Sequence, residues 1–173
     1  MIDAATYSAI ETLRDGRRVE IRALRPQDRT ELAAAIGRAS VVSRYRRFFA
    51  VRRGFSEKET DFFVNVDFVN HVALVAVVDE GGRAAIIGGG RYVVVQPGKA
   101  EVAFTIIDAY QGQGVGSALL RHLVAISREA GLQELVAEVL PENTPMLKLF
   151  EKCGCRMSIE REPEVVHVTL GLK

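Results

Sequence analysis

Three glycines at alternate positions, Gly112, Gly114 and Gly116, lie in the stretch of sequence that could do chemistry. Residues 101–107 before them are rich in apolar and β-branched side chains, as in a strand, and residues 115–126 repeat apolar side chains at helical spacing. Because glycine removes side chains where the loop turns into the helix, several N–H groups could point at one anion, with the helix dipole behind them. The pattern therefore predicts a loop that cradles phosphate.

Two better-known phosphate loops have other spacings. A dinucleotide-binding fingerprint needs its third glycine one residue later and an acidic residue about 20 residues on, whereas the next predicted strand carries Glu138 only at its far end. A P-loop needs Gly-Lys followed by Ser or Thr, which this loop lacks. A glycine-rich helix start that binds no ligand is the simpler alternative, and the loop alone leaves it open.

Length and composition favour one ordinary globular domain. A chain of 173 residues with 48% hydrophobic residues can bury a full core, so we expect a single domain over residues 1–173, with residues 1–10 as a frayed or helical lead-in. The net charge of +1 gives no overall attraction to nucleic acid or membrane, and the longest strongly apolar run, residues 72–78, is too short to span a bilayer. No secretion signal is visible, so the sequence predicts a cytoplasmic protein.

Polar residues elsewhere are weaker catalytic candidates. His71, His122 and His167 could each act as a general base, but the sequence shows no partner beside any of them. Asp67 and Asp108 lie near the predicted loop and strands, where turn and cap roles are the simpler interpretation. We therefore assign no catalytic role to these five residues.

Two further features have structural explanations. Cys153 and Cys155 are the chain's cysteines, and their spacing without a neighbouring histidine predicts small buried thiols and no metal site. Residues 44–53 combine arginines with aromatic side chains, which could attract RNA or an acidic protein surface. A helix with an aromatic buried face and a basic solvated face explains the same pattern, and we favour it.

Around the loop, hydrophobic periodicity and turn residues place the supporting elements. The Gly88-Gly89-Gly90 run favours a kink or bulge in a strand over a second ligand loop. The order of elements predicts an α+β, or mixed α/β, fold with helices on a largely antiparallel sheet. Besides the central strand and its helix, we expect strands at residues 12–14, 19–24, 72–78, 84–95, 134–140, 156–160 and 165–170, and helices at residues 29–38, 43–49, 56–64 and from about 141 to 154.

The loop resembles a known cosubstrate site. Gln111, Gly114 and Gly116 match the pattern Gln/Arg-x-x-Gly-x-Gly/Ala, which is the acetyl-CoA pyrophosphate loop of the GNAT superfamily of N-acetyltransferases. The order of elements is similar to the GNAT order over residues 13–170. The resemblance implies a central mixed, mostly antiparallel sheet flanked by helices, and acetyl-CoA as cosubstrate.

A later segment is similar to another part of that family. GNAT members carry a helix that begins near Asn and ends in Tyr-Glu-Lys-Leu-Gly-Phe or a similar sequence, and here Asn143 is followed by Phe-Glu-Lys-Cys-Gly-Cys at residues 150–155. Phe150 is a departure, because many members have at this place the tyrosine that protonates the departing CoA thiolate. A phenyl ring has no proton to give.

A narrower group, the bacterial Pat-type protein lysine acetyltransferases, is similar over additional stretches. In that group a glutamate at the position of Glu101 is the proposed general base. The resemblance therefore implies a protein lysine as acceptor, with an AMP-forming acyl-CoA synthetase as the first candidate. The similar stretches are residues 43–49, 66–67, 71–75, 100–104 and 108–112.

Acetyl transfer to lysine sets requirements that the central strand could meet. An unperturbed lysine amine is neutral only about once in a thousand molecules at neutral pH, so a base helps. Glu101 and Thr105 share a strand face by alternation but lie about 13 Å apart, so a bulge or a water relay would be needed. Counting by the resemblance, the N–H of Thr105 or Ile106 donates to the thioester oxygen, an oxyanion-hole role.

The leading hypothesis is an acetyl-CoA-dependent lysine acetyltransferase whose partners are acetyl-CoA and a substrate protein. A small-molecule amine acetyltransferase is the enzymatic alternative, and Phe150 makes a non-catalytic acyl-CoA-sensing module credible. The implied catalytic residues are Glu101 and Thr105, and the implied cosubstrate-binding residues are Thr105, Ile106, Ile107, Gln111, Gly112, Gln113, Gly114, Val115, Gly116, Ser117 and Asn143.

Overall fold

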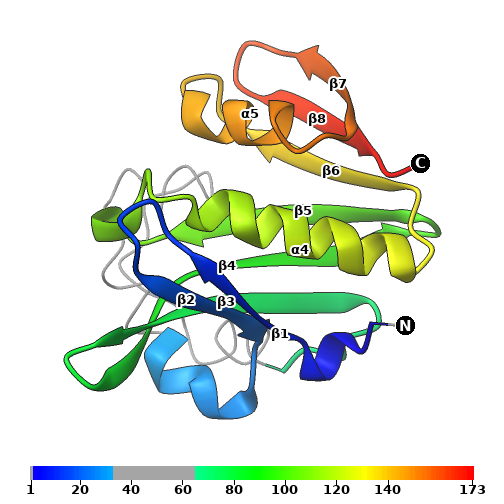
Figure 1. The fold of residues 1–173 in the computed structure, drawn as a ribbon. Helices are drawn as coiled ribbons and strands as arrows, with labels where there is room; N and C mark the ends of the chain where they lie inside the picture. The colour runs from blue at the N-terminus through cyan, green and yellow to red at the C-terminus, as the bar shows by residue number, and fades with distance from the viewer. Residues whose placement is uncertain (1, 33–64) are drawn as a thin grey trace.

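The computed structural model describes residues 2–32 and 65–173, which form one eight-stranded sheet with helices beside it (Figure 1). The spatial order of the strands is β1-β2-β3-β4-β5-β6-β8-β7. The strands are β1 (Ser8–Thr12), β2 (Arg18–Ala23), β3 (His71–Glu80), β4 (Arg83–Gln96), β5 (Lys99–Ile106), β6 (Glu134–Val139), β7 (Arg156–Arg161) and β8 (Val166–Gly171). The helices are η1 (Ala4–Thr6), η2 (Pro26–Asp28), η3 (Asp108–Tyr110), α4 (Val115–Glu129) and α5 (Thr144–Glu151).

One pair of neighbouring strands is parallel. Strands β5 and β6 pair in parallel over residues 99–101 and 134–136, and the other neighbours in the sheet are antiparallel. Beyond this short ladder, β5 runs on to Ile106 and β6 to Val139 without pairing with each other. Figure 1 shows the two strands moving apart. The mixed, mostly antiparallel sheet expected from the sequence is confirmed, and it opens between β5 and β6.

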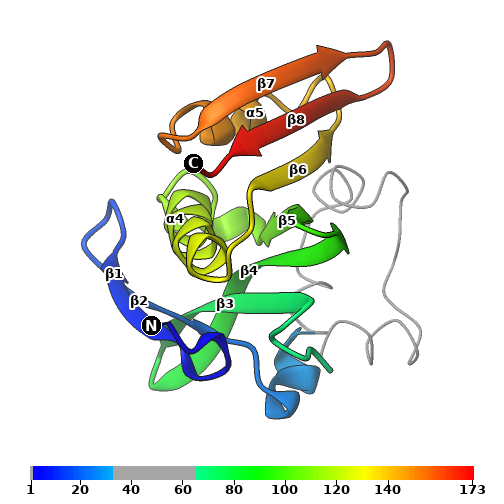
Figure 2. The ribbon, with the colours of Figure 1, turned by 90° about the vertical axis from the view of Figure 1, so that its right-hand side faces the viewer.

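Helix α4 covers one face of the sheet and contacts β3, β4 and β5 (Figure 2). Its buried side chains include Val115, Leu119 and Leu123, as the helical spacing predicted. Two side chains fill the space above Gly90 of β4, where a Cβ would stand 2.7 Å from the ring of Phe104 on β5 and 3.1 Å from Leu123 of α4. A side chain at this position would have to displace the Phe104 ring and Leu123, so the packing here favours glycine.

Most strand predictions hold with shifted ends, but the strand expected at residues 12–14 is wrong, because β1 ends at Thr12. The predicted hairpin around Asp15 and Gly16 is present, but β1 begins at Ser8, so the expected lead-in over residues 1–10 extends too far. The register of β3 and β4 shifts between Ala76 and Val77, next to the glycine run, which confirms a bulge there. The bulge fits the weakness of glycine in a regular strand.

The helix predictions are confirmed only in part. Residues 29–32 are helical, whereas the rest of the helix expected at 29–38 and those expected at 43–49 and 56–64 lie outside the described residues. Helix α5 begins at Thr144 and ends at Glu151, inside its predicted bounds, because Asn143 caps it. In the described ranges no helix is long and apolar enough to cross a membrane.

Candidate active site

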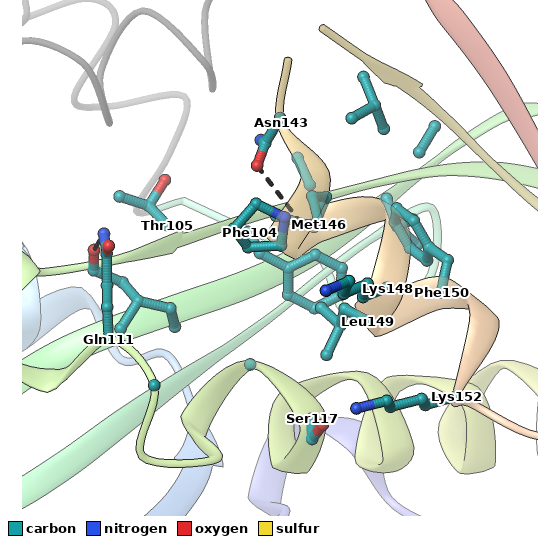
Figure 3. Close-up of a pocket in the computed structure, with 18 of the residues that line it drawn as sticks. Phe104, Thr105, Gln111, Ser117, Asn143, Met146, Lys148, Leu149, Phe150 and Lys152 are labelled. Carbon is teal, nitrogen blue, oxygen red and sulfur yellow. Dashed lines mark hydrogen bonds between the residues drawn. The ribbon is translucent and has the colours of Figure 1, made fainter. Parts of the chain in front are cut away.

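A cavity of about 420 Å³ lies where β5 and β6 separate (Figure 3). Residues 102–106 of β5 and residues 137–139 of β6 form two of its walls. The glycine loop, the first turn of α4 and the inner side of α5 complete it. The short parallel ladder therefore creates the cavity, because strands paired along their whole length would leave no space between them.

The glycine loop adopts the conformation that its sequence predicts. Gly112 has φ of +79° and Gly114 has φ of +95°, in the left-handed region that side chains disfavour. A Cβ on either residue would meet no atom within 4 Å, so the space above the loop is open. In the described part of the chain, the N–H groups from Gly112 to Ser117 have no acceptor. Free N–H groups at the start of a fifteen-residue helix, α4, fit a pyrophosphate.

The hairpin between β1 and β2 holds this loop from outside. The Arg14 guanidinium donates from Nη1 to the carbonyl of Gly112 at 3.1 Å, and the Arg14 backbone N–H donates to the carbonyl of Gln113 at 3.2 Å. Two loop carbonyls are thereby turned toward the hairpin, which leaves the loop N–H groups free for a ligand. Sequence reasoning missed Arg14, because nothing local connects residues 98 positions apart.

A second set of contacts holds η3, which leads into the loop. The Tyr110 hydroxyl donates to Glu80 Oε2 at 2.6 Å and accepts from Arg17 Nη1 at 3.1 Å. The Arg17 guanidinium also lies over the Tyr110 ring, 4.7 Å from its centroid. Burial, reinforced by the hydrogen bond to Glu80, raises the pKa of Tyr110. The tyrosine therefore stays a neutral donor, and the side chain of Gln111 donates to the Ile106 carbonyl nearby at 3.1 Å.

The far wall of the cavity is apolar. Phe150 is buried, and its ring is tilted against that of Phe104 with centroids 6.3 Å apart. Asn143 lines the cavity and accepts from the N–H of Met146 at 3.3 Å, which caps α5 (Figure 3). Phe150 brings no proton donor to this wall, while the hydroxyl of Ser117 lies on the opposite one.

The predicted site residues separate into two groups. Ile107 and Val115 are buried in the core, and Gln113 turns toward the hairpin with its Oε1 atom buried and without a partner in the described residues. These three do not line the cavity, and neither does Glu101, which is exposed where β5 and β6 are still paired. The residues that do line it are Thr105, Ile106, Gln111, Gly112, Gly114, Gly116, Ser117 and Asn143.

Sequence reasoning missed several side chains that line the cavity. Lys148 and Lys152 reach it from α5, and Glu138 reaches it from the end of β6. Their positions depend on the packing of α5 beside α4, where a Cβ at Gly116 would stand 3.5 Å from Leu149. Helical spacing could have placed the two lysines on one face, but it does not say what that face meets.

None of the three histidines lines the cavity. His122 contacts the Tyr7 hydroxyl and lies 2.8 Å from Glu11, and His167 lies 3.0 Å from Glu162, which raises the pKa of His167. His71 is buried at the start of β3, with its Nε2 atom 2.9 Å from Arg91 Nη1. Burial first and Arg91 second lower the pKa of His71 to about 4, against a smaller opposing effect of Asp67. His71 is therefore neutral and accepts from Arg91.

This buried histidine predicts a pH dependence of stability. The pKa of His71 is about 4 in the folded chain and about 6.5 when unfolded, so the unfolded chain binds more protons between these values. Stability from this residue is present above about pH 6.5 and is lost as the pH falls toward 4, by up to about 1.4 kcal/mol per pH unit. Urea unfolding of the wild type and His71→Asn should show a difference that shrinks in this window. Parallel curves from pH 4.5 to 7.5 would contradict the assignment.

A sequence model of the Acetyltransferase (GNAT) family matches residues 38–155, more than half of the chain.
The chain belongs to the GNAT family of acetyltransferases.
It is accordingly an acetyltransferase with acetyl-CoA as cosubstrate, and the loop and the open space above it fit the pyrophosphate of that cosubstrate. The described residues show no group of three or more metal-binding side chains.

Relatives place the chain within the family. An acetyltransferase of Pseudomonas aeruginosa is 33% identical over 156 residues, which cover 90% of this chain and 83% of that protein. Acetyltransferase Pat of Mycolicibacterium smegmatis is 36% identical over 112 residues, covering 64% of this chain but only 33% of that protein. The crystal structure of the GNAT domain of S. lividans Pat has a TM-score of 0.86 and 36% identity, over 95% of this chain and 96% of that one. The resemblance to the Pat group is confirmed.

Replacing Phe150 by tyrosine should change turnover by less than about threefold. A CoA thiol with a pKa near that of free cysteine, about 8.5, leaves without a dedicated acid, and solvent or Ser117 can protonate it afterwards. Because Phe150 is buried against Phe104, the new hydroxyl should instead lower the free energy of unfolding by about 1–3 kcal/mol if it finds no partner. Steady-state kinetics and urea unfolding test both effects. A tenfold gain in turnover would indicate a crippled enzyme or a sensor.

Proposed function

We propose that this GNAT enzyme transfers the acetyl group of acetyl-CoA to a lysine side chain of a folded protein, with an AMP-forming acyl-CoA synthetase as the first candidate. The likeness to the GNAT domain of S. lividans Pat over nearly the whole chain is the observation that carries the proposal. The cavity supports it, because its open end between β5 and β6 gives an amine a route to the end of the cosubstrate.

The pairing of β4 with β5 supports a choice between the two proposed donors to the thioester oxygen. In an antiparallel ladder, successive N–H groups point to opposite sides of the strand. Since the N–H of Ile107 donates to Ile87 of β4, that of Thr105 also points to β4 and that of Ile106 points into the gap toward β6. We therefore assign the oxyanion role to Ile106, and Thr105 keeps a place in the cavity wall through its side chain.

Glu101 is the proposed general base, on the face of β5 away from α4. Phe104 faces α4, so alternation puts Glu101 and Thr105 on the opposite face. Glu101 is exposed and about 13 Å along the strand from Thr105, so a relay of water molecules must carry the proton from the amine to it. The amine nitrogen then bonds to the acetyl carbon, the carbon–sulfur bond breaks, and the thiolate takes a proton from solvent, either directly or through the Ser117 hydroxyl.

The substrate protein should dock through the basic and aromatic segment at residues 44–53. This segment lies outside the described residues, and its role rests on the Pat-type resemblance of the sequence. A free lysine or a short peptide would forfeit these remote contacts and should react poorly. Arg46→Glu with Arg47→Glu should weaken protein acetylation more than acetyl-CoA binding, and raising the salt concentration should mimic part of the loss.

The decisive experiment compares catalytic efficiency on three kinds of acceptor. These are a purified AMP-forming acyl-CoA synthetase, the same synthetase with its target lysine changed to arginine, and a panel of small amines. We expect acetylation of the intact synthetase, none at the arginine and slow reaction of the small amines. If a small amine reacts far better than any protein, the protein-substrate proposal fails while the family and cosubstrate stand.

One alternative has an observation in its favour. Phe150 leaves the usual proton donor missing, as a module that senses acyl-CoA without turnover would allow. Such a module would bind acetyl-CoA yet release no CoA with any acceptor. Thiol release measured alongside calorimetric binding separates the two functions.

A further inference from the structure

Two lysines, Lys148 of α5 and Lys152 at its C-cap, face the cavity and have no partner among the described residues. Lys148 and Lys152 are four residues apart, so they share one side of the helix, and both line the cavity. Figure 3 shows the Lys152 side chain running from α5 toward Ser117 of α4, just beyond the glycine loop. In the described part of the chain neither ammonium makes an ion pair or a hydrogen bond.

The other charged side chains that line the described cavity have contacts elsewhere, so the two lysines can bind a ligand. Arg14 also lines the cavity, but its guanidinium is bound to the carbonyl of Gly112. Glu138 is the acidic side chain of the described wall, and its Oε1 atom lies 3.9 Å from His167. Lys148 and Lys152 are therefore cations facing the space between α4 and α5, with no acid of the chain bound to them.

The cosubstrate has more charge than the loop can bind. The free N–H groups from Gly112 to Ser117 suit the pyrophosphate, and CoA also carries a phosphate monoester on the 3′ position of its ribose. The ribose is bonded directly to the pyrophosphate, so the 3′-phosphate must lie beside the site of the pyrophosphate. Lys152 points to the first turn of α4, immediately next to the loop.

We propose that Lys148 and Lys152 bind the 3′-phosphate of CoA and thereby select CoA over its precursor dephospho-CoA. Two ammonium groups can make charge-assisted hydrogen bonds to one phosphate, which are about twice as strong as neutral ones. Both lysines are exposed and near the C-terminal end of α5, where a cation also interacts favourably with the helix dipole. The interaction of the lysines with the α5 dipole gives no preference between CoA and dephospho-CoA. The difference in affinity between these two ligands is therefore the property to measure.

The test is calorimetric binding of acetyl-CoA and acetyl-dephospho-CoA to three proteins. The wild type should bind acetyl-CoA about tenfold or more tightly than the dephospho form, and Lys148→Gln with Lys152→Gln should bind both about equally. Lys173→Gln removes a charge away from the cavity and should keep the wild-type preference. Arg14→Gln should weaken both ligands alike, because Arg14 holds the loop that binds their shared pyrophosphate.

The ratio of the two affinities, for acetyl-CoA and for acetyl-dephospho-CoA, distinguishes binding of the 3′-phosphate from other roles of the lysines. Equal losses for both ligands in the double lysine variant would place the lysines at the pyrophosphate and overturn the proposal, as would a preserved preference. Lys148→Arg with Lys152→Arg keeps the charges and should keep most of the preference. If the glutamine variant does not fold, the wild type still decides, since its affinity for acetyl-CoA should fall more steeply with salt than its affinity for the dephospho form. Equal salt slopes would overturn the proposal.

Discussion

Gly114→Asp should abolish measurable binding of acetyl-CoA in a chain that still folds. Gly114 is the N-cap of α4 and faces open space, so the new side chain meets no neighbouring atom, although the φ of +95° adds a cost of about 1–2 kcal/mol in backbone strain. The aspartate carboxylate would accept from N–H groups of the first turn, as good N-caps do, and would occupy the donors that the pyrophosphate needs. Its negative charge would repel the phosphates as well.

Calorimetric binding measurements on two control variants separate the effect of the negative charge from the effect of a side chain on a backbone with positive φ. Gly114→Asn has nearly the same shape without the charge, so it should lose less affinity than Gly114→Asp. Gly82→Asp tests the backbone, because Gly82 also has positive φ, at +86°, and open space but lies in the turn between β3 and β4. It should cost about 1–2 kcal/mol of stability and leave binding intact. A folded Gly114→Asp protein with unchanged affinity would remove the loop from the cosubstrate site.

Glu101→Gln should lower catalytic efficiency at neutral pH by about 10²-fold or more, the usual scale for a positioned base. Affinity for acetyl-CoA should not change, because Glu101 does not line the cavity. Raising the pH should recover part of the rate, since more of the lysine amine is then neutral without help from the protein. Rates measured from pH 6.5 to 9.5, with acetyl-CoA affinity alongside, test all three expectations.

Glu138 provides the matched control for this base. It is the carboxylate that lines the described cavity, whereas Glu101 lies outside it. We expect Glu138→Gln to leave the pH profile unchanged. If Glu138→Gln loses the larger part of the rate and Glu101→Gln is as fast as the wild type at every pH, the base is Glu138 and Glu101 is structural.

Local chemistry explains what the sequence could predict. The glycine loop, the strand before it and the helix after it depend on neighbours along the chain, and the buried face of the helix followed from the spacing of its apolar residues. Asn143 was predicted from the family resemblance, and in the structure it lines the cavity and caps α5. These features lie on two of the cavity walls.

Tertiary packing decided what the sequence could not predict. Ile107 and Val115 belong to the matched segment, yet strand pairing and helix packing turn both into the core. The brace by Arg14 and the two lysines of α5 depend on segments brought together from distant parts of the chain. A motif thus located the loop, but the side chains around it required the fold.

The parting of β5 and β6 also bears on association between chains. Unpaired strand edges invite strands of other molecules to add to a sheet and start aggregation. Here the unpaired backbone of residues 102–106 and 137–139 lies inside the molecule, walled by α5 and the glycine loop. The outer edges of the sheet are β1 and β7, of five and six residues, and short edge strands are poor templates. In the described fold, the unpaired backbone of β5 and β6 is therefore accessible to a small ligand in the cavity but not to a strand of another molecule.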